Sequence, residues 1–422
     1  MLDIKEIIKN PDLAKKKLQR KGVAPKKIDE LLTYDQEKKE FLQKIENFKN
    51  QQNKISKIFA TLQGEEKEKI LLEMKNISEQ KKVLEKDLVV TETNYKNLLE
   101  KLPNPPDEDA PDGEDDTQNI EIKTFGEIKK FDFEPKQHWE LAENLNLLDT
   151  QRSAKVSGSR FYFLKNKLAI LQRALIFWAF TEVAKSGFSP MIPPFLTKDK
   201  ALYGTGYLDK KENYCINPGE DNLYLIGTSE VPMVSYFQDE ILDEADMPIK
   251  FVSYSPCFRK EAGTYGKDMK GIFRVHQFEK VEMVVFCLPE ETKSMHKKLL
   301  EIEENLLQKL EIPYRVVDVC CGDLGISATR KYDIEAWLPG QNKFRELTST
   351  SICTDFQSRR LKIRIKRKNG EIVHAHTLNG TAVSSRPLIA ILENFQQKDG
   401  SIKIPKVLQK LCGFEKINYT TE

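Results

Sequence analysis

The chain has 422 residues, and its 67 basic and 65 acidic side chains leave a formal net charge of only +2. This length allows two or three domains with a buried core, and no signal peptide or long apolar run is present, so we expect a cytoplasmic protein that does not span a membrane. The seven cysteines form no CxxC pair, which indicates reduced thiols and no zinc cluster.

Charge is unevenly distributed along the chain. Residues 1–27 carry nine Lys or Arg against three acids, and Arg359 to Lys368 holds seven basic residues in ten. Asp107 to Asp116 contains seven acids and no base. Local basic surfaces suit a phosphate-rich partner, although a merely soluble lysine-rich surface explains each run equally well.

Two segments near the N-terminus carry the spacing of a coiled coil. Apolar and long side chains recur at alternating intervals of three and four between residues 31 and 62 and again between residues 70 and 102. The short connection Gln63 to Lys69 predicts two antiparallel helices, each roughly 45–50 Å long at about 1.5 Å per residue. Such an arm is too thin for a catalytic pocket, so it is either a reaching or docking device or a dimerisation helix pair.

The helical arm is followed by a stretch that cannot fold as a helix. Pro103 to Asp116 contains four prolines and seven acids, which predicts an exposed linker. We therefore divide the chain into an N-terminal domain, residues 1–102, with its arm from about residue 27, an acidic linker, residues 103–119, and a remainder, residues 120–422.

The remainder mixes strands and helices. We expect helices at Leu164 to Ala184 and Met295 to Leu310, and strands at Tyr314 to Cys320, Tyr332 to Leu338 and Phe344 to Thr348. This pattern predicts an α+β domain, an antiparallel sheet flanked by helices. Neither GxGxxG after a strand nor GxxxxGK[ST] occurs, which excludes a Rossmann site and a Walker loop.

The segment Cys257 to Met283 predicts a hairpin with charges on one face. Alternation places Arg259 and Glu261 together on the first strand. On the returning strand it predicts a polar face and an apolar back. The polar face would hold Arg274, His276, Phe278, Lys280 and Glu282, and the back Phe273, Val275, Val281, Met283 and Val285. We expect a mobile loop at residues 262–271 because it holds three glycines. A solvated sheet face is the alternative reading.

A helix begins near the C-terminus with an arginine in its first turn. Ser384 or Ser385 can cap this helix, and Pro387 suits an early helical position after Arg386. Free N–H groups, the helix dipole and an arginine together favour a phosphate ligand.

These segments resemble the three signature motifs of the class II aminoacyl-tRNA synthetases. The motifs are a helix followed by GFSPMIPP (residues 187–194), the FRKEAG…FRVHQFEKVE hairpin and the helix that opens with Arg386. With Thr228-Ser-Glu230, the NGT of residues 379–381 and the helical arm, the chain resembles the bacterial-type seryl-tRNA synthetases along nearly its whole length. It lacks the cysteine-rich zinc site of the atypical methanogen-type enzymes.

The resemblance implies a role for each motif residue. It implies that Arg259 and Arg386 are the catalytic phosphate clamps, that Glu261 contacts the adenine edge and that Phe278 stacks beneath the adenine ring. Glu346 and Ser349 would hold Mg²⁺ through oxygen. The full implied ATP site is Arg259, Lys260, Glu261, Arg274, Val275, Phe278, Glu346, Leu347, Thr348, Ser349 and Arg386. The implied serine site is Thr228, Ser229, Glu230, Arg259, Glu282 and Thr381.

The resemblance also implies a reaction and its partners. The reaction would be ATP-dependent activation of L-serine, followed by transfer to the 3′ end of serine tRNA and, where present, selenocysteine tRNA. The cofactors would be ATP and Mg²⁺ without zinc, and the enzyme would be a homodimer whose arm grips the long variable arm of the tRNA. Two alternatives remain open: an amino acid:carrier-protein ligase and a non-catalytic tRNA-binding homologue.

Overall fold

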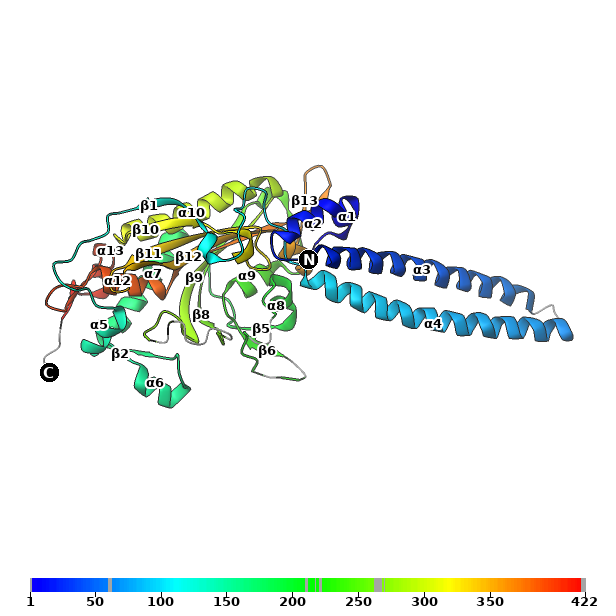
Figure 1. The fold of residues 1–422 in the computed structure, drawn as a ribbon, viewed down its shortest axis with the longest axis horizontal. Helices are drawn as coiled ribbons and strands as arrows, with labels where there is room; N and C mark the ends of the chain where they lie inside the picture. Colours follow the sequence, from blue (N-terminus) through cyan, green and yellow to red (C-terminus); the bar gives the residue numbers. More distant parts are fainter. Residues whose placement is uncertain are drawn as a thin grey trace. The chain divides into compact units, whose positions relative to one another are not determined.

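The computed structural model describes residues 2–59, 63–208, 212–216, 218–219, 222–261, 268 and 270–418. The chain packs into two compact units, Met1–Pro105 and Pro106–Glu422. Figure 1 shows that the first unit is helical and that the second is built on a large sheet.

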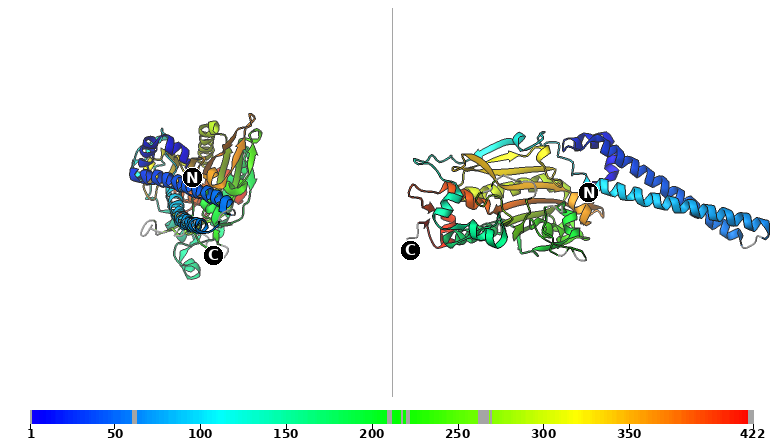
Figure 2. Two further views of the ribbon diagram at one scale, coloured as in Figure 1. Left: turned by 90° about the vertical axis from the view of Figure 1, so that its right-hand side faces the viewer. Right: turned by 60° about the horizontal axis from the view of Figure 1, so that its bottom comes forward.

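The helical unit consists of α1 (Ile4–Lys9), α2 (Pro11–Gln19), α3 (Pro25–Phe59) and α4 (Glu65–Lys101). Helices α3 and α4 lie side by side (Figure 2), as the heptad spacing predicts. Their pairing brings Lys38 Nζ to 5.2 Å from the ring centroid of Tyr95. Helix α4 begins before the predicted connection ends, because Glu65, Glu66 and Glu68 favour the positive end of its dipole.

The second unit is organised around an eight-stranded sheet in the order β1-β10-β11-β12-β15-β9-β8-β4. Neighbouring strands are antiparallel except β4 and β8, which are parallel. The strands are β1 (Ile120–Phe125), β4 (Ser189–Met191), β8 (Ile249–Phe258), β9 (Gln277–Cys287), β10 (Tyr314–Asp318), β11 (Arg330–Leu338), β12 (Lys343–Thr354) and β15 (His376–Ser384). The predicted α+β class is confirmed.

Helices and small sheets surround this central sheet. The helices are α5 (His138–Asn144), α6 (Thr150–Ser157), α7 (Asn166–Lys185), α8 (Asp199–Thr205), α9 (Glu230–Val234), α10 (Thr292–Lys309), α11 (Phe356–Leu361), α12 (Arg386–Asn394) and α13 (Lys406–Cys412). The short strands are β2 (Leu148–Asp149), β3 (Phe163–Leu164), β5 (Leu196–Lys198), β6 (Leu223–Leu225), β7 (Ile241–Asp243), β13 (Arg364–Lys366), β14 (Ile372–His374), β16 (Ile402–Lys403) and β17 (Lys416–Ile417).

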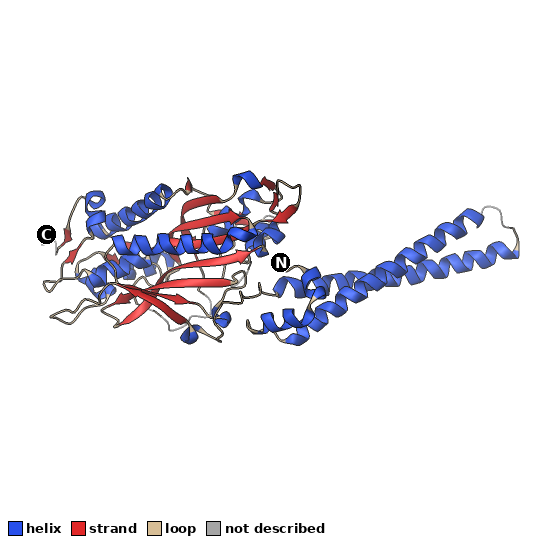
Figure 3. Ribbon diagram, turned by 90° about the horizontal axis from the view of Figure 1, so that it is seen from above, coloured by secondary structure: helices blue, strands red, loops and turns tan. Residues whose placement is uncertain are grey.

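The two predicted long helices, α7 and α10, pack on one face of the central sheet, and Figure 3 shows long helices lying across its strands. Leu171 and Leu175 of α7 and Leu299 of α10 are fully buried in one apolar cluster with the sheet. Burying such side chains is the main stabilising contribution of this layer. In the part of the chain that the structure describes, no helix is long and apolar enough to cross a membrane.

The predicted hairpin exists as β8 and β9, which pair antiparallel from Ile249↔Phe286 to Phe258↔Gln277. Along β9 the alternation holds, because Val281, Met283 and Val285 are buried in the cluster beneath the helices. It fails before Gln277, where the chain turns and is not a strand. Phe273 and Val275 are nevertheless buried in the same apolar cluster as Val281, Met283 and Val285, as predicted for the apolar back, and both also line the pocket described below. Most of the predicted loop, residues 262–267 and 269, lies outside the described residues.

Two of the register shifts in the central sheet change which side chains face the pocket described below. Strand β12 pairs Thr348 with Ile334 but Glu346 with Glu335, so Leu347 is an extra residue. Strand β15 pairs Thr381 with Glu282 and Val383 with Val281, so Ala382 is also extra. Each such bulge reverses the alternation that follows it.

Candidate active site

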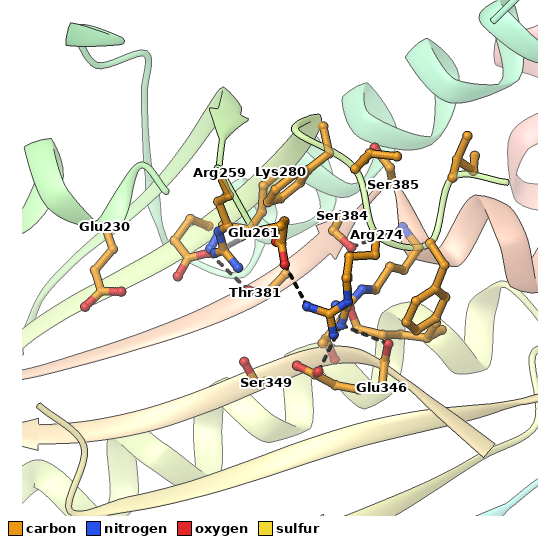
Figure 4. Close-up of a pocket in the computed structure, with 18 of the residues that line it drawn as sticks. Glu230, Arg259, Glu261, Arg274, Lys280, Glu346, Ser349, Thr381, Ser384 and Ser385 are labelled. Atoms are coloured by element: carbon orange, nitrogen blue, oxygen red, sulfur yellow. Dashed lines mark hydrogen bonds and ion pairs between the residues drawn. The ribbon is translucent and has the colours of Figure 1, made fainter. Parts of the chain in front are cut away.

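A pocket of about 330 Å³ opens on the face of the sheet opposite α7 and α10. Strands β9, β12 and β15, the start of α12 and the segments that connect β8 with β9 supply most of its walls (Figure 4). The lining residues are Tyr207, Glu230, Arg259, Glu261, Ile272, Phe273, Arg274, Val275, Phe278, Lys280, Glu282, Glu346, Leu347, Thr348, Ser349, Ser351, Asn379, Thr381, Ser384, Ser385 and Arg386.

One end of the pocket, which we call the acidic end, is built around Glu230 at the start of α9. Its carboxylate accepts hydrogen bonds from Tyr207 Oη at 2.7 Å, Gln357 Nε2 at 2.8 Å and Asn379 Nδ2 at 3.0 Å. Only 1% of Glu230 is exposed. Burial, followed by the nearby charge of Glu282, raises the pKa of Glu230 to about 6. A carboxylate fixed by three donors in this way can bind a cationic group.

Glu282 forms the second part of the acidic end. Lys280 and Glu282 are neighbours on the pocket face of β9, with Nζ and Oε2 2.5 Å apart. Thr381 Oγ1, on the adjacent strand, donates to Glu282 Oε2 at 3.2 Å. Because Lys280 and Glu282 are almost fully buried, removing either partner would leave an uncompensated charge.

Arg259 lies between the two ends, directly after β8. Its Nε donates to the carbonyl oxygen of Gly227 at 3.1 Å, and its guanidinium carbon is 5.2 Å from the ring centroid of Phe278. The Nε of Arg259 is thus bonded to the backbone, and one face of its guanidinium packs on the Phe278 ring. This arrangement fixes the orientation of a planar group that can bind a phosphate or carboxylate in two places.

The other end, which we call the arginine end, contains two arginine–glutamate pairs. Arg274 Nη1 lies 2.7 Å from Glu261 Oε2, and Arg386 Nη1 lies 2.9 Å from Glu346 Oε2. The Arg386 backbone N–H also donates to Ser384 Oγ at 3.2 Å, while the N-cap residue of α12 is Ser385, whose side chain makes no capping bond. In Figure 4, Glu230 lies at the left, and Arg274 and Glu346 lie at the right.

Glu346 and Ser349 have the chemistry of ligands for a hard divalent cation. Partial burial raises the pKa of Glu346, but the charges of Arg386 and Lys331 outweigh this effect and lower the pKa to about 2. The bulge at Leu347 brings Glu346 and Ser349 to the same pocket although they are three residues apart. A carboxylate and a hydroxyl are oxygen ligands of the kind Mg²⁺ takes alongside phosphates and water. Among the described residues, no group of three or more His, Cys, Asp or Glu forms a metal site.

Several predicted site residues have side chains directed elsewhere. Lys260 Nζ lies over the ring of Tyr214 at 5.6 Å, outside the lining. Thr228 Oγ1 accepts from the Glu230 N–H, and Ser229 Oγ accepts from Ser253, so both lie behind the pocket wall. Thr348 lines the pocket, but its hydroxyl donates to Glu303 of α10 on the other side of the sheet.

The lining also contains residues that were not predicted as site residues. For Lys280 and Asn379 a signal existed, because each is two residues from a predicted site residue on the same strand face, Glu282 and Thr381 respectively. Tyr207 lies far away in sequence, and no local pattern marks it. The remaining additions are Ile272, Phe273, Ser351, Ser384 and Ser385.

Family models match both units of the chain. The tRNA synthetase class II core domain (G, H, P, S and T) matches residues 213–395, and the seryl-tRNA synthetase N-terminal domain matches residues 1–106. A serine–tRNA ligase of Dictyoglomus turgidum is 44% identical over 421 residues, which is 99% of each chain. A serine–tRNA ligase of Nitrosopumilus maritimus is 43% identical over 99% of this chain and 100% of its own.

Solved structures give the same result. The crystal structure of seryl-tRNA synthetase from Pyrococcus horikoshii complexed with ATP matches all of both chains with a TM-score of 0.92 and 42% identity. The cytoplasmic serine–tRNA ligase of Naegleria fowleri in complex with AMP matches 98% of this chain and 96% of its own with a TM-score of 0.85 and 31% identity. With family models on both units and relatives of full length, the chain belongs to the seryl-tRNA synthetase family of class II aminoacyl-tRNA synthetases.

Proposed function

We propose that this chain is a serine–tRNA ligase that activates L-serine with ATP and transfers the seryl group to the 3′ end of serine tRNA. The observation that carries the proposal is a single pocket with buried carboxylates at one end and arginines at the other. Full-length relatives named serine–tRNA ligase support it. Selenocysteine tRNA, where a cell has it, is a second substrate of the same proposal, and the reaction takes place in the cytoplasm.

ATP occupies the arginine end. Arg259 and Arg386 bind its phosphates, Glu261 contacts the adenine edge and Phe278 lies beneath the ring. Arg274, Val275, Leu347, Thr348 and Ser349 complete this wall, while Lys260 acts from outside it. The pairs Arg274–Glu261 and Arg386–Glu346 keep the cations neutralised, so ATP binding must rearrange these contacts.

Serine occupies the acidic end. Glu282 accepts a hydrogen bond from the serine hydroxyl beside Thr381, and Glu230 faces the amino group. Thr228 and Ser229 act by holding Glu230 in place, since their hydroxyls bond to its backbone N–H and to Ser253. Alanine would leave Glu282 without a partner for its free oxygen, a penalty that reaches about 10⁴-fold in sites built for a hydroxyl.

Mg²⁺ would be held by Glu346 and Ser349 together with ATP, and it would neutralise charge on the phosphates. The serine carboxylate attacks the α-phosphorus, a bond forms between them, and pyrophosphate leaves. A ribose hydroxyl of the terminal adenosine of the tRNA then attacks the acyl carbon, and AMP leaves. No side-chain nucleophile is needed, because in-line positioning and charge neutralisation supply the catalysis.

The helical unit, residues 1–102 with its arm, binds tRNA in this proposal. Its two long helices offer exposed lysines for phosphates, with affinity that falls as salt rises. Residues 103–119 join it to the catalytic part, residues 120–422, but they are not the exposed linker predicted, because Ala110 is buried and the Asp107 N–H donates to the Thr329 carbonyl oxygen within the second unit. Deletion of residues 31–102 with a short bridge should leave serine activation intact but abolish charging of tRNA. Efficient charging by the deleted protein would show that the arm has only a structural role.

A homodimer completes the proposal. On α7, Ile170 is 47% and Phe177 58% exposed, and Ile192 beyond the helix is 71% exposed. Apolar side chains left this exposed suit a protein–protein interface. Light scattering at micromolar concentration should report a dimer, and Phe177→Asp should convert it to a monomer. A wild-type monomer would contradict this arrangement.

The test of the activity is ATP–pyrophosphate exchange. Exchange that requires serine, together with charging of serine tRNA, is the expected result. Exchange with serine but transfer to a carrier protein and not to tRNA would favour a carrier-protein ligase. Binding of tRNA without any exchange would favour a non-catalytic homologue.

A further inference from the structure

A buried histidine and glutamate lie outside the pocket lining but are connected to its wall. His138 is the first residue of α5, and Glu393 is near the end of α12. They are 2% and 0% exposed. The Glu393 carboxylate accepts from His138 N–H at 3.1 Å and from Gly340 N–H at 3.0 Å, and its Oε1 lies 3.1 Å from His138 Nδ1.

The second ring nitrogen of His138 faces the pocket wall. The Ile272 backbone N–H donates to Nε2 at 3.2 Å. Nε2 can accept this bond only when it carries no proton, so the proton of a neutral ring must be on Nδ1 and directed at Glu393. Glu393 thereby selects the tautomer that can hold Ile272.

Ile272 belongs to residues 270–276, which we call the return segment because they lead into β9. Ile272, Phe273, Arg274 and Val275 of this segment line the pocket. The ring of Phe273 lies 3.7 Å from the guanidinium carbon of Arg345 and 4.8 Å from that of Arg386. Displacement of the return segment would therefore move one aromatic support of the Arg386 guanidinium.

The backbone at Gly271 packs directly against the His138 ring and leaves no room for a side chain. A Cβ on Gly271, whose φ is +75°, would lie 2.1 Å from His138 Nε2. Only glycine permits such close approach of the chain to the ring. Arg345 also contacts the return segment, because its guanidinium lies over the ring of Phe273. The same guanidinium donates to Gln341 at 2.9 Å and to Asp268 at 2.7 Å.

We propose that His138 is a positioning residue for adenylate formation: held by Glu393 in one tautomer, it fixes the return segment and so the wall at the arginine end of the pocket. This inference rests on the proposed function and adds to it a residue outside the lining. Glu393 and Arg386 lie near opposite ends of α12, so the same helix carries the anchor of the wall and a phosphate clamp.

The matched variants are His138→Asn and His138→Gln. The asparagine amide can replace the Nδ1 donor but does not reach Ile272, whereas the glutamine oxygen reaches the position of Nε2 and can accept its bond. In pyrophosphate exchange we expect H138N to raise the KM for ATP about tenfold, with the KM for serine unchanged and H138Q restoring most of the loss. Hydrogen exchange should show lost protection at the Ile272 amide in H138N and retained protection in H138Q.

The control is His376→Asn, since His376 Nδ1 bonds to Thr292 outside the pocket. It should leave the KM for ATP unchanged. If H138N does not fold, Gly271→Ala disrupts the same bond from the other side and should raise the KM for ATP selectively. An unchanged KM for ATP in the folded variant, or an equal loss in H138N and H138Q, overturns the proposal. Absence of serine-dependent pyrophosphate exchange in the wild type would instead refute the proposed function. Hydrogen exchange at the Ile272 amide would still test whether His138 holds the return segment.

Discussion

The two ends of the pocket differ in how deeply their charged side chains are buried and in how they are paired. At the acidic end, Glu230 and Glu282 are 1% exposed and are held by neutral donors and by Lys280. At the arginine end, Glu346 and Arg386 are 39% and 25% exposed and pair directly with each other. The buried end is already assembled for its ligand, whereas the arginine end is neutralised by partners that a polyphosphate must displace.

This difference has an energetic reason. A buried charge cannot remain unpaired without a penalty of several kcal/mol, so the acidic end has its partners fixed by the fold. A half-exposed ion pair contributes about 1 kcal/mol or less, so it can exchange partners readily. We therefore expect substitutions at the acidic end to affect stability as well as binding, and those at the arginine end to affect mainly catalysis.

The largest effect is expected for Arg386→Ala. Loss of a phosphate clamp aimed at developing charge should lower serine-dependent pyrophosphate exchange by about 10³-fold or more, with little change in the free energy of unfolding. Arg259→Ala should behave in the same way. The control is Arg315→Ala, which removes a guanidinium paired with Glu335 on the same sheet but outside the pocket. Near-normal pyrophosphate exchange in Arg386→Ala or Arg259→Ala would show that the arginine end does not carry the phosphate clamps.

Glu282→Gln should weaken serine binding by about 10²-fold and also destabilise the fold by about 3–5 kcal/mol, because Lys280 would lose its buried partner. Adding Lys280→Met should recover stability but not the KM for serine. The measurements are urea unfolding and the exchange rates with serine and alanine. Full stability in the single variant would show that Lys280 has another partner.

The raised pKa of Glu230 predicts a pH dependence. If ionised Glu230 binds the amino group, kcat/KM for serine should fall about tenfold for each pH unit below about 6, because the carboxylate protonates there. Glu230→Gln should remove this dependence and lower the activity. A wild-type profile that stays flat down to pH 5 would contradict the role of Glu230.

The same shift predicts an effect on stability. Because folding raises this pKa from 4.5 to about 6, the contribution of Glu230 is most favourable below about pH 4.5 and is lost as pH rises through 6. The loss is about 2 kcal/mol. Unfolding at pH 4.5 and pH 7 should therefore differ less in Glu230→Gln than in the wild type.

The smallest effect is expected for Glu261→Gln at the arginine end. Its pair with Arg274 is partly exposed, so the free energy of unfolding should change by about 1 kcal/mol or less. The KM for ATP should rise only a few-fold, since the amide can still contact an adenine edge. A loss of stability like that of Glu282→Gln would show that the two ends do not differ as proposed.

The sequence by itself determined what depends on regular local spacing. Heptads predicted α3 and α4, a period of two placed Phe278, Lys280 and Glu282 on one face, and Pro387 marked the start of α12. These predictions hold because helix and strand periods are properties of the backbone. The resemblance to the family added the identity of the ligands, which no period can supply.

The tertiary structure decided what depends on interruptions of that spacing and on distant partners. Glu346 and Ser349 would point to opposite faces of a regular strand, and the bulge at Leu347 unites them. Tyr207 and Gln357 reach Glu230 from α8's C-terminal side and from α11, and His138 meets Ile272 across 134 residues. Packing brings these groups together, and no local pattern encodes it, because the free energy of such contacts depends on the whole fold.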